Sequence, residues 1–337
     1  MLILNETELR GLLGMREAVQ AVEQGFRALG MGQTRCPERI NMALPELGGT
    51  FLEMPSAMLP GADEDVAGNQ DQKAALGTKI VTVFGANRDR GMDVVQSIYI
   101  LLDPATGKPI AIMDGKFITG IRTAAASALA TQYMARQGPT VLGIIGAGVQ
   151  AAFHIEAMIC TANIERVIIQ SRTQAKAERL AAQVDRKFGV QVELTRSPAK
   201  LLAECGIICT CTTSPEPLFD GDLVAPGTHI NAVGAFTPET RELDTKTIAR
   251  ARVIIDAAQS AGVEAGEILI PTSEGTIGTS HIKGSLSDLV LGRVAGRTSA
   301  DEVTVFKSCG LAVEDLVTAH VAYRNAMRRG TGTHQEI

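Results

Sequence analysis

Three places in the sequence carry residues whose types and spacing could do chemistry. A glycine turn follows an apolar run at Gly146, a lysine begins the apolar segment at Lys79, and Arg122 stands among small residues. A glycine turn at the start of a helix exposes backbone N–H groups to phosphates. A lysine that faces a cleft can pair with an anion or move a proton, although a lysine in contact with water is the simpler alternative.

The glycine turn has the spacing of a dinucleotide-binding site. Residues 141–145 form an apolar run typical of a central parallel strand. Gly146, Gly148 and Ala151 then fit G-x-G-x-x-G/A, in which the first glycine permits the tight turn and the second lets a pyrophosphate approach the backbone. A helix beginning near Gln150 would point its free N–H groups at the phosphates. The alternative is a turn that serves only the packing of the helix on the strand. We assign to the cofactor Gly146, Gly148, Val149 and Gln150.

The end of the second predicted strand indicates which cofactor binds. Residues 166–170 form this strand, and Ser171, Arg172 and Thr173 follow it without a carboxylate. An acidic residue here normally accepts the ribose hydroxyls of NAD, whereas an arginine accommodates the extra phosphate of NADP. Arg172 could lie on that phosphate with the two hydroxyls donating to it, unless it is only a solvated loop residue. We predict that NADPH is preferred, with NADH as the second possibility.

Alternating strands and helices after residue 140 predict an α/β fold with a doubly wound parallel sheet. Ligands of such sheets bind at the carboxyl ends of the strands. Thr212 and Thr213 stand at the end of the strand predicted at residues 206–211, and Val233 ends the strand predicted at residues 230–233. We assign these three residues to the cofactor site.

Periodicity and glycine or proline breakers predict the remaining elements. Residues 36–60 are expected to form short strands and turns around Arg39, and residues 62–73 a surface loop. We predict a frayed tail after Gly330, a flexible segment at residues 85–91, and helices at residues 15–29, 119–135, 173–188, 198–204, 285–294 and 312–327. Further strands are expected at residues 78–84, 94–102, 110–113, 191–194 and 253–256. Arg122 would then lie in the first turn of its helix, where the helix dipole disfavours a cation. A functional role for Arg122, such as binding a substrate carboxylate or a cofactor phosphate, is therefore favoured.

Composition narrows the class of protein. A chain of 337 residues has room for two domains, and 45% hydrophobic with 20% charged residues is ordinary for a soluble protein. A net charge of −5 without a run of lysines or arginines argues against nucleic acid and anionic membranes as partners. The first ten residues lack the positive charge of a signal peptide, so a cytoplasmic enzyme is expected. The six cysteines show no metal-type spacing, which predicts reduced, mostly buried thiols and no metal.

The chain resembles the ornithine cyclodeaminase and mu-crystallin family from end to end. The resemblance rests on TKIVT around Lys79, AIMDGKFITGIRTAAASA around Arg122, GAGVQA at Gly146, HINAVG at His229, RELD ending at Asp244 and VFKSCGLAVED ending at Asp315. It implies a Rossmann domain at residues 119–311, inserted into a second α+β domain made of residues 1–118 and 312–337. It also implies that this second domain binds the substrate and forms the interface of a homodimer.

The resemblance also implies roles for three cations. Family chemistry would place the substrate carboxylate on Arg39, Lys79 and Arg122, with the match for Arg39 resting on the shorter stretch RINM. Lys79 would lie near the imine or amine nitrogen and is the candidate catalytic proton donor. Burial beside two arginines would lower the pKa of Lys79 and ease that role.

Members of the family differ in the residues after HINAVG. The cyclodeaminases and the alanine dehydrogenase-like members carry an aspartate two residues after that glycine, where this sequence has Phe236. Phenylalanine cannot accept a proton, so ring closure with loss of ammonia is disfavoured and Phe236 would instead offer an apolar wall to the substrate. The SRT at residues 171–173 is similar to the NRT of mu-crystallin-like ketimine reductases, which use NADPH.

These features lead to the hypothesis of an NADPH-dependent reductase of small cyclic α-imino acids. Its substrates would be of the pyrroline-2-carboxylate or piperideine-2-carboxylate type and its product an L-amino acid, because the cofactor supplies the hydride and the protein supplies position and charge. Three alternatives use the same fold: reductive amination of a 2-oxo acid, a lyase of the cyclodeaminase or hydroxyproline dehydratase type, and a small-ligand carrier. Intact Lys79 and Arg122 weigh against the carrier.

Overall fold

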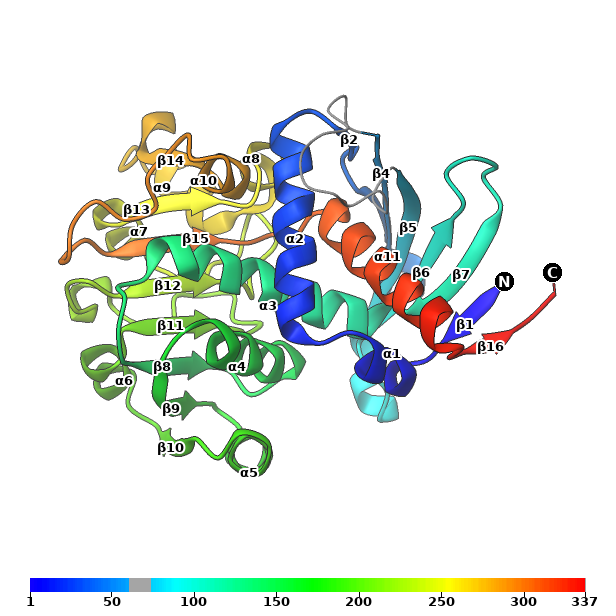
Figure 1. Ribbon diagram of the computed structural model, residues 1–337. Coiled ribbons are helices and arrows are strands. Elements are labelled where there is room, and N and C mark those ends of the chain that lie inside the picture. The colour runs from blue at the N-terminus through cyan, green and yellow to red at the C-terminus, as the bar shows by residue number, and fades with distance from the viewer. Residues whose placement is uncertain (61–73, 337) are drawn as a thin grey trace. The chain divides into compact units, whose positions relative to one another are not determined.

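The computed structural model describes residues 1–60 and 74–336, so the surface loop predicted at residues 62–73 lies outside the described residues. The chain divides into two compact units. Unit 1 consists of Met1–Arg122 and Leu311–Ile337, and unit 2 consists of Thr123–Gly310. Unit 2 therefore interrupts unit 1 once in the sequence, and helix α3 (Gly115–Met134) contains the boundary between them (Figure 1).

Unit 1 contains a mixed eight-stranded sheet. Its order is β16-β1-β7-β6-β5-β4-β2, and β3 pairs with β4. All neighbours are antiparallel except β1 and β7, which run parallel. The bounds are β1 (Leu2–Leu4), β2 (Thr34–Arg35), β3 (Ile40–Leu44), β4 (Gly49–Met58), β5 (Ala75–Phe84), β6 (Val95–Leu102), β7 (Pro109–Asp114) and β16 (Thr333–His334).

Helices cover one face of this sheet. Helix α11 (Ala312–Arg329) packs on β4, β5 and β6 and against α2 (Met15–Gly30), while α1 (Glu6–Leu12) contacts β7 and α11. The two long helices approach closely at Gly25, where an added Cβ would lie 3.2 Å from both methyl groups of Val317. The chain's last long helix therefore completes the core that the first hundred residues begin.

Unit 2 contains an eight-stranded sheet in which every neighbouring pair is parallel. The strand order is β10-β9-β8-β11-β12-β15-β13-β14, so the direction of winding reverses between β8 and β11. The bounds are β8 (Thr140–Ile145), β9 (Ile164–Gln170), β10 (Gln191–Thr195), β11 (Ile207–Thr210), β12 (His229–Ala232), β13 (Arg252–Ile255), β14 (Ile282–Ser285) and β15 (Thr304–Lys307). The prediction of a doubly wound α/β fold with a second α+β part is confirmed.

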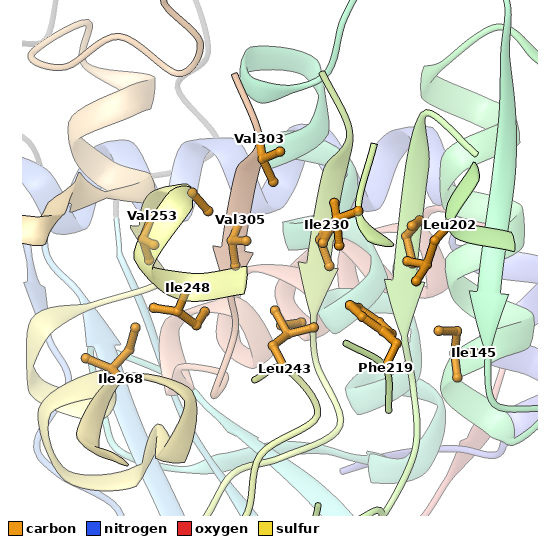
Figure 2. Close-up of a cluster of buried hydrophobic side chains, with 14 of the residues drawn as sticks. Ile145, Leu202, Phe219, Ile230, Leu243, Ile248, Val253, Ile268, Val303 and Val305 are labelled. Atoms are coloured by element: carbon orange, nitrogen blue, oxygen red, sulfur yellow. The ribbon is translucent and has the colours of Figure 1, made fainter. Parts of the chain in front are cut away.

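The strands of unit 2 are apolar because helices cover both faces of the sheet. One buried cluster joins Ile230 and Val305 of the central strands to Leu202 and Ile248 of covering helices (Figure 2). The helices of this unit are α4 (Val149–Thr161), α5 (Gln174–Phe188), α6 (Pro198–Glu204), α7 (Thr245–Arg250), α8 (Ala258–Glu264), α9 (Gly266–Ser273) and α10 (Leu286–Val290). This packing fixes the carboxyl ends of β8, β11 and β12, where the predicted cofactor residues follow.

The predicted start of α3 was wrong, and with it the position of Arg122. The helix begins at Gly115 rather than at Thr119, because the Asp114 carboxylate accepts a hydrogen bond from the backbone N–H of Phe117 (2.7 Å) and caps the first turn. Arg122 therefore lies well inside the helix. The argument that the helix dipole disfavours a cation at Arg122 does not apply.

Other differences concern short elements. The tail after Gly330 is not frayed, because β16 pairs with β1 and the backbone N–H of Gln335 donates to the carbonyl of Met1 (2.9 Å). The segment predicted to be flexible at residues 85–91 contains a 3₁₀ helix, Gly85–Arg90. The strand β15 in the middle of the unit 2 sheet was not predicted. Within the described ranges, no helix has both the length and the apolar character to cross a membrane.

Candidate functional site

Lys79 lies on the buried face of β5 and not toward water. Alternation along this central strand buries Ala75, Gly77, Lys79 and Val81 beneath the covering helices. The strand register places Lys79 opposite Met54 of β4 and Tyr99 of β6. Lys79 therefore places its ammonium group in the core of unit 1, within a strand whose other buried side chains are apolar.

The ammonium of Lys79 meets two acidic residues of α11 and the guanidinium of Arg122. Lys79 Nζ donates to Asp315 Oδ2 (2.7 Å), Arg122 Nε donates to Asp315 Oδ1 (3.0 Å), and Arg122 Nη1 donates to Glu314 Oε2 (3.0 Å). Lys79 is only 1% exposed, Arg122 5%, and both carboxylates are fully buried. Asp315 is therefore the centre of a buried ion cluster, which we call the Asp315 cluster: Lys79, Arg122, Glu314 and Asp315.

The start of α11 holds the two carboxylates in place. Glu314 Oε1 accepts a hydrogen bond from the backbone N–H of Leu311 (2.9 Å), which satisfies a donor at the helix end. Negative charge in the first turn also interacts favourably with the helix dipole. The side chain of Glu314 is thus held by its own helix, whereas that of Asp315 is held by the two cations.

Burial and charge together set the proton affinities in this cluster. Burial lowers the pKa of Lys79 to about 8, and the positive charges of Arg122 and Arg39 add to this effect while Asp315 opposes it. The pKa of Arg122 is raised, because Asp315 and Glu314 together outweigh the effect of its burial. Arg39 itself is half-buried. At neutral pH the three cations exceed the two carboxylates by one positive charge, which suits one bound carboxylate.

The glycine turn of unit 2 has room for a ligand. Gly146 has φ of +114°, and an added Cβ would lie 2.4 Å from the carbonyl oxygen of Cys211, so the fold itself requires a glycine there. Gly148 is different, since its φ is −95° and an added Cβ would meet nothing within 4 Å. Gly148 begins α4 without any side-chain cap, and Val149 is 65% exposed beside it. The backbone N–H of Gly146 donates to the carbonyl of Gln170 (2.8 Å), so the N–H groups that can face a phosphate are those at the start of α4.

Two orphaned oxygens lie beside this turn and the next strand. Gln150 Oε1 and Gln170 Oε1 are buried without a hydrogen-bond partner among residues 1–60 and 74–336. After Gln170, Ser171 Oγ accepts from the backbone N–H of Thr173 (3.2 Å), and Arg172 is exposed. No carboxylate in the described part of the chain forms an ion pair with Arg172. The open glycine turn, the unsatisfied acceptors and the exposed cation fit a phosphorylated dinucleotide.

The remaining predicted residues follow β11 and β12. Thr213 is exposed, whereas the hydroxyl of Thr212 is used within the protein, donating to Glu242 Oε1 (2.7 Å) and accepting from the backbone N–H of Ser214 (3.1 Å). Val233 is half-buried just after β12, and Phe236 is 47% exposed. Thr212 follows the strand next to β8, where the winding reverses and where ligands of such sheets bind.

Sequence reasoning missed the acidic partners. The motifs VFKSCGLAVED and RELD contain Glu314, Asp315 and Glu242, but the sequence predicts no role for these three residues. Two adjacent acidic residues at a helix start and one acidic residue in a loop are both common on protein surfaces, so neither pattern indicates a buried ion. Among the residues described, no group of three or more His, Cys, Asp or Glu side chains could hold a metal ion. Of the six free cysteines only Cys205 and Cys209 are buried, so the prediction of mostly buried thiols was too strong.

We predict that Asp315→Asn destabilises the protein by about 3–5 kcal/mol, because two buried cations lose their shared partner. The measurement is urea unfolding at pH 7. The matched control is Asp222→Asn, whose carboxylate is 69% exposed beside Lys246 and should change stability by less than about 0.5 kcal/mol. Adding Lys79→Met to Asp315→Asn should recover part of the loss. Equal stability of wild type and Asp315→Asn would contradict the shared-partner arrangement.

Known proteins resemble this chain over its whole length. Residues 1–330 match the ornithine cyclodeaminase/mu-crystallin family. A Delta(1)-pyrroline-2-carboxylate reductase from Bacillus cereus is 34% identical over 338 residues, covering 100% of both chains. The structure of Thermococcus litoralis Delta(1)-pyrroline-2-carboxylate reductase in complex with NADH and L-proline superimposes with a TM-score of 0.93 at 36% identity, covering 99% of this chain and 100% of the other. An archaeal alanine dehydrogenase dimer with bound NAD gives a TM-score of 0.89 at 31% identity, covering 100% and 99%. The predicted resemblance is confirmed, and the chain belongs to the ornithine cyclodeaminase/mu-crystallin family.

Proposed function

We propose that this protein is an NADPH-dependent reductase of small cyclic α-imino acids of the pyrroline-2-carboxylate or piperideine-2-carboxylate type, and that its product is the L-amino acid. The observation that carries the proposal is Lys79, a buried ammonium with a pKa of about 8 that shares Asp315 with Arg122. Reduction of a C=N bond needs a hydride at carbon and a proton at nitrogen, and this lysine suits the second task. The relatives named for pyrroline-2-carboxylate reduction support the substrate class.

The cofactor would lie at the carboxyl edge of the unit 2 sheet. Gly146, Gly148, Val149 and Gln150 would hold the pyrophosphate, Ser171, Arg172 and Thr173 the ribose phosphate, and Thr212, Thr213 and Val233 the nicotinamide end. NADPH supplies the hydride when bound. The exposed guanidinium of Arg172 and the lack of a carboxylate at residues 171–173 favour NADPH over NADH. The relatives' structures contain NADH and NAD, so the proposed preference for NADPH rests on residues 171–173 of this chain alone.

The substrate carboxylate would pair with Arg39, Lys79 and Arg122 in unit 1. Asp315 and Glu314 already neutralise two of these cations, and the remaining positive charge matches one carboxylate. Arg122 uses Nε and Nη1 in its two ion pairs, and its Nη2 would be the atom that binds the substrate carboxylate. The charges of the Asp315 cluster balance one another, so the remaining positive charge is that of Arg39, and a bound carboxylate would offset it.

Lys79 would then donate its proton to the imine nitrogen. In doing so it becomes neutral, and the hydrogen bond to Asp315 keeps the amine in position for reprotonation from solvent. Phe236 would offer an apolar surface to the ring of the substrate. We assign substrate binding to unit 1 and cofactor binding to unit 2, so that Arg122 belongs to the substrate side. The domain limits of residues 1–118 with 312–337 and residues 119–311 stay a prediction, and they would place Arg122 in the cofactor domain.

We further propose that the protein is a homodimer through the unit 1 sheet. The face opposite the helices carries apolar side chains that are open in the single chain, including Ile3 (39% exposed) and Ile98 (41% exposed). The related alanine dehydrogenase structure is described as a dimer. Light scattering should give twice the mass of one chain, and the mass of a single chain would contradict this proposal.

The proposed function is tested by following NADPH absorbance with Δ1-pyrroline-2-carboxylate, with NADH in a parallel assay. Rapid loss of NADPH with formation of L-proline is expected. Pyruvate with ammonia is the second substrate tested, because the alanine dehydrogenase relative points to reductive amination. Faster turnover of pyruvate and ammonia would replace the proposal by that reaction. Saturable NADPH binding without turnover of either substrate would leave the lyase or carrier functions.

We predict that Lys79→Met lowers kcat for imine reduction at least about 100-fold, as expected for loss of a general acid. Lys79 donates only in its protonated form, so wild-type kcat/KM should fall as pH rises through about 8. This fall should be absent in the residual activity of Lys79→Met. The control is Lys108→Met, an exposed lysine in the turn between β6 and β7. A variant at Lys79 with full kcat would refute its role as proton donor.

We predict that Arg172→Ala lowers kcat/KM for NADPH about 10- to 100-fold, because a charged hydrogen-bonding partner of the phosphate is lost. The value for NADH should hardly change. Arg186→Ala is the matched control, since Arg186 is an exposed arginine near the opposite end of α5. Equal or better use of NADH by the wild-type enzyme would contradict the assignment of Arg172.

A further inference from the structure

One buried carboxylate ties together the two chain segments that follow β11 and β12. Glu242 is fully buried, and its two oxygens accept four hydrogen bonds. Oε1 accepts from the backbone N–H and the hydroxyl of Thr212, and Oε2 accepts from the hydroxyl of Thr210 and the backbone N–H of Gly234, each at 2.7 Å. Each oxygen therefore holds one backbone N–H from a different strand end.

The two segments approach each other closely at this point. A Cβ added to Gly234 would lie 2.1 Å from the carbonyl oxygen of Thr212, so no other residue fits there without moving the backbone. The segment after β11 also contacts the glycine turn, because a Cβ on Gly146 would lie 2.4 Å from the carbonyl of Cys211. A shift of the segment after β11 would therefore reach the glycine turn directly, and Glu242 connects the segment after β12 to it.

A buried lysine binds a carbonyl group of the segment after β12, whereas Glu242 binds an N–H group of the same segment. Lys307, at the end of β15, is fully buried and donates from Nζ to the carbonyl of Ala235. It also forms an ion pair with Glu267 Oε2 (3.2 Å). Gly234 is thus fixed through its N–H by a carboxylate, and Ala235 through its carbonyl by an ammonium. The next residue is Phe236.

The backbone of Glu242 is also held on both sides. The backbone N–H of Glu242 donates to Glu267 Oε1 (2.9 Å), and its carbonyl accepts from the backbone N–H of Leu218 (2.8 Å). Glu267 therefore touches both Glu242 and Lys307 and links the two anchors. A side chain held this firmly can fix the positions of the backbone groups that it binds.

We propose that Glu242 and Lys307 are positioning residues for the cofactor site: they set the spacing between residues 212–213 and 233–236. This inference rests on the proposed function, because it assigns those segments to the nicotinamide end of the cofactor. Both side chains are fully buried and bind groups of the protein, so their effect on the cofactor would be indirect. Glu242 determines how far Thr212 and Val233 stand apart, and Lys307 determines where the chain turns toward Phe236.

The arrangement requires a carboxylate and not merely a polar side chain. In Glu242→Gln the side-chain NH₂ must replace either Oε1 or Oε2, and each oxygen holds a backbone N–H. A threonine hydroxyl can rotate to accept from an NH₂ group, but a backbone N–H cannot. Either Thr212 or Gly234 therefore loses its acceptor in both orientations of the amide. The spacing of the two segments should change while the apolar core remains.

The test is titration of NADPH and NADH into the purified protein, followed by nucleotide fluorescence, with thermal unfolding of the free protein measured beside it. Glu242→Gln is expected to weaken binding of both nucleotides by about 10-fold or more. Thr210→Val is the comparison, because it removes one hydrogen bond to the same carboxylate but leaves both backbone donors bound. It should lower Tm while changing nucleotide affinity less than 3-fold. Glu239→Gln, which changes an exposed carboxylate, should alter neither property.

Gly234→Ala is a second variant that tests the spacing of the two segments without changing any charge. Its methyl group would push against the carbonyl of Thr212, so it should weaken nucleotide binding even if Glu242→Gln does not fold. Wild-type affinity in folded Glu242→Gln, or in Gly234→Ala, would overturn the positioning role alone. A loss of affinity in Thr210→Val as large as that in Glu242→Gln would also overturn it, because general destabilisation would then explain both. Absence of nucleotide binding by the wild-type protein would overturn the proposed function and this inference together.

Discussion

Asp315 binds two cations at once, Lys79 through one oxygen and Arg122 through the other, at a place that excludes water. Burying either cation without a partner would be strongly unfavourable, so the carboxylate must be present wherever the two cations are. It comes from α11, near the end of the chain, whereas Lys79 comes from β5. The ion cluster therefore joins the two segments of unit 1, which unit 2 separates in the sequence. Because burial also keeps the pKa of Lys79 near 8, the same constraint produces a usable acid.

Unit 2 uses a buried carboxylate for a different purpose. Its parallel sheet ends in segments whose backbone groups find no further strand partner, and these groups need acceptors and donors from side chains. Glu242 and Lys307 supply them at the ends of β11, β12 and β15, on the side of the sheet where the glycine turn opens. Both units therefore combine a rigid apolar sheet with a few buried ions. In the proposed function the ions of unit 1 would bind the substrate, whereas the ions of unit 2 hold backbone groups.

Much of this could be predicted from local patterns. The strand, glycine turn and helix at Gly146 are contiguous, and each is encoded by nearby residues, so their positions were predicted to within a few residues. Motifs predicted the family and singled out Lys79 and Arg122 as candidate site residues. The partners of Lys79 and Thr212 did not, because 236 residues separate Lys79 from Asp315 and 30 separate Thr212 from Glu242. Periodicity indicates which residues are buried but not which buried charges meet. The predicted position of Arg122 in the first turn of α3 was wrong for a local reason: Asp114 caps the helix and starts it four residues earlier, at Gly115.

In the proposed reaction, the hydride of NADPH would reach the C=N carbon of a cyclic imine that the cations of unit 1 bind. The most direct measurement is the reaction of Δ1-pyrroline-2-carboxylate with NADPH deuterated at C4 of the nicotinamide, followed by mass spectrometry and NMR of the proline formed. L-Proline with one deuterium at Cα is predicted when the transferable position is labelled. Proline without deuterium, or no proline despite nucleotide binding, would contradict the claim.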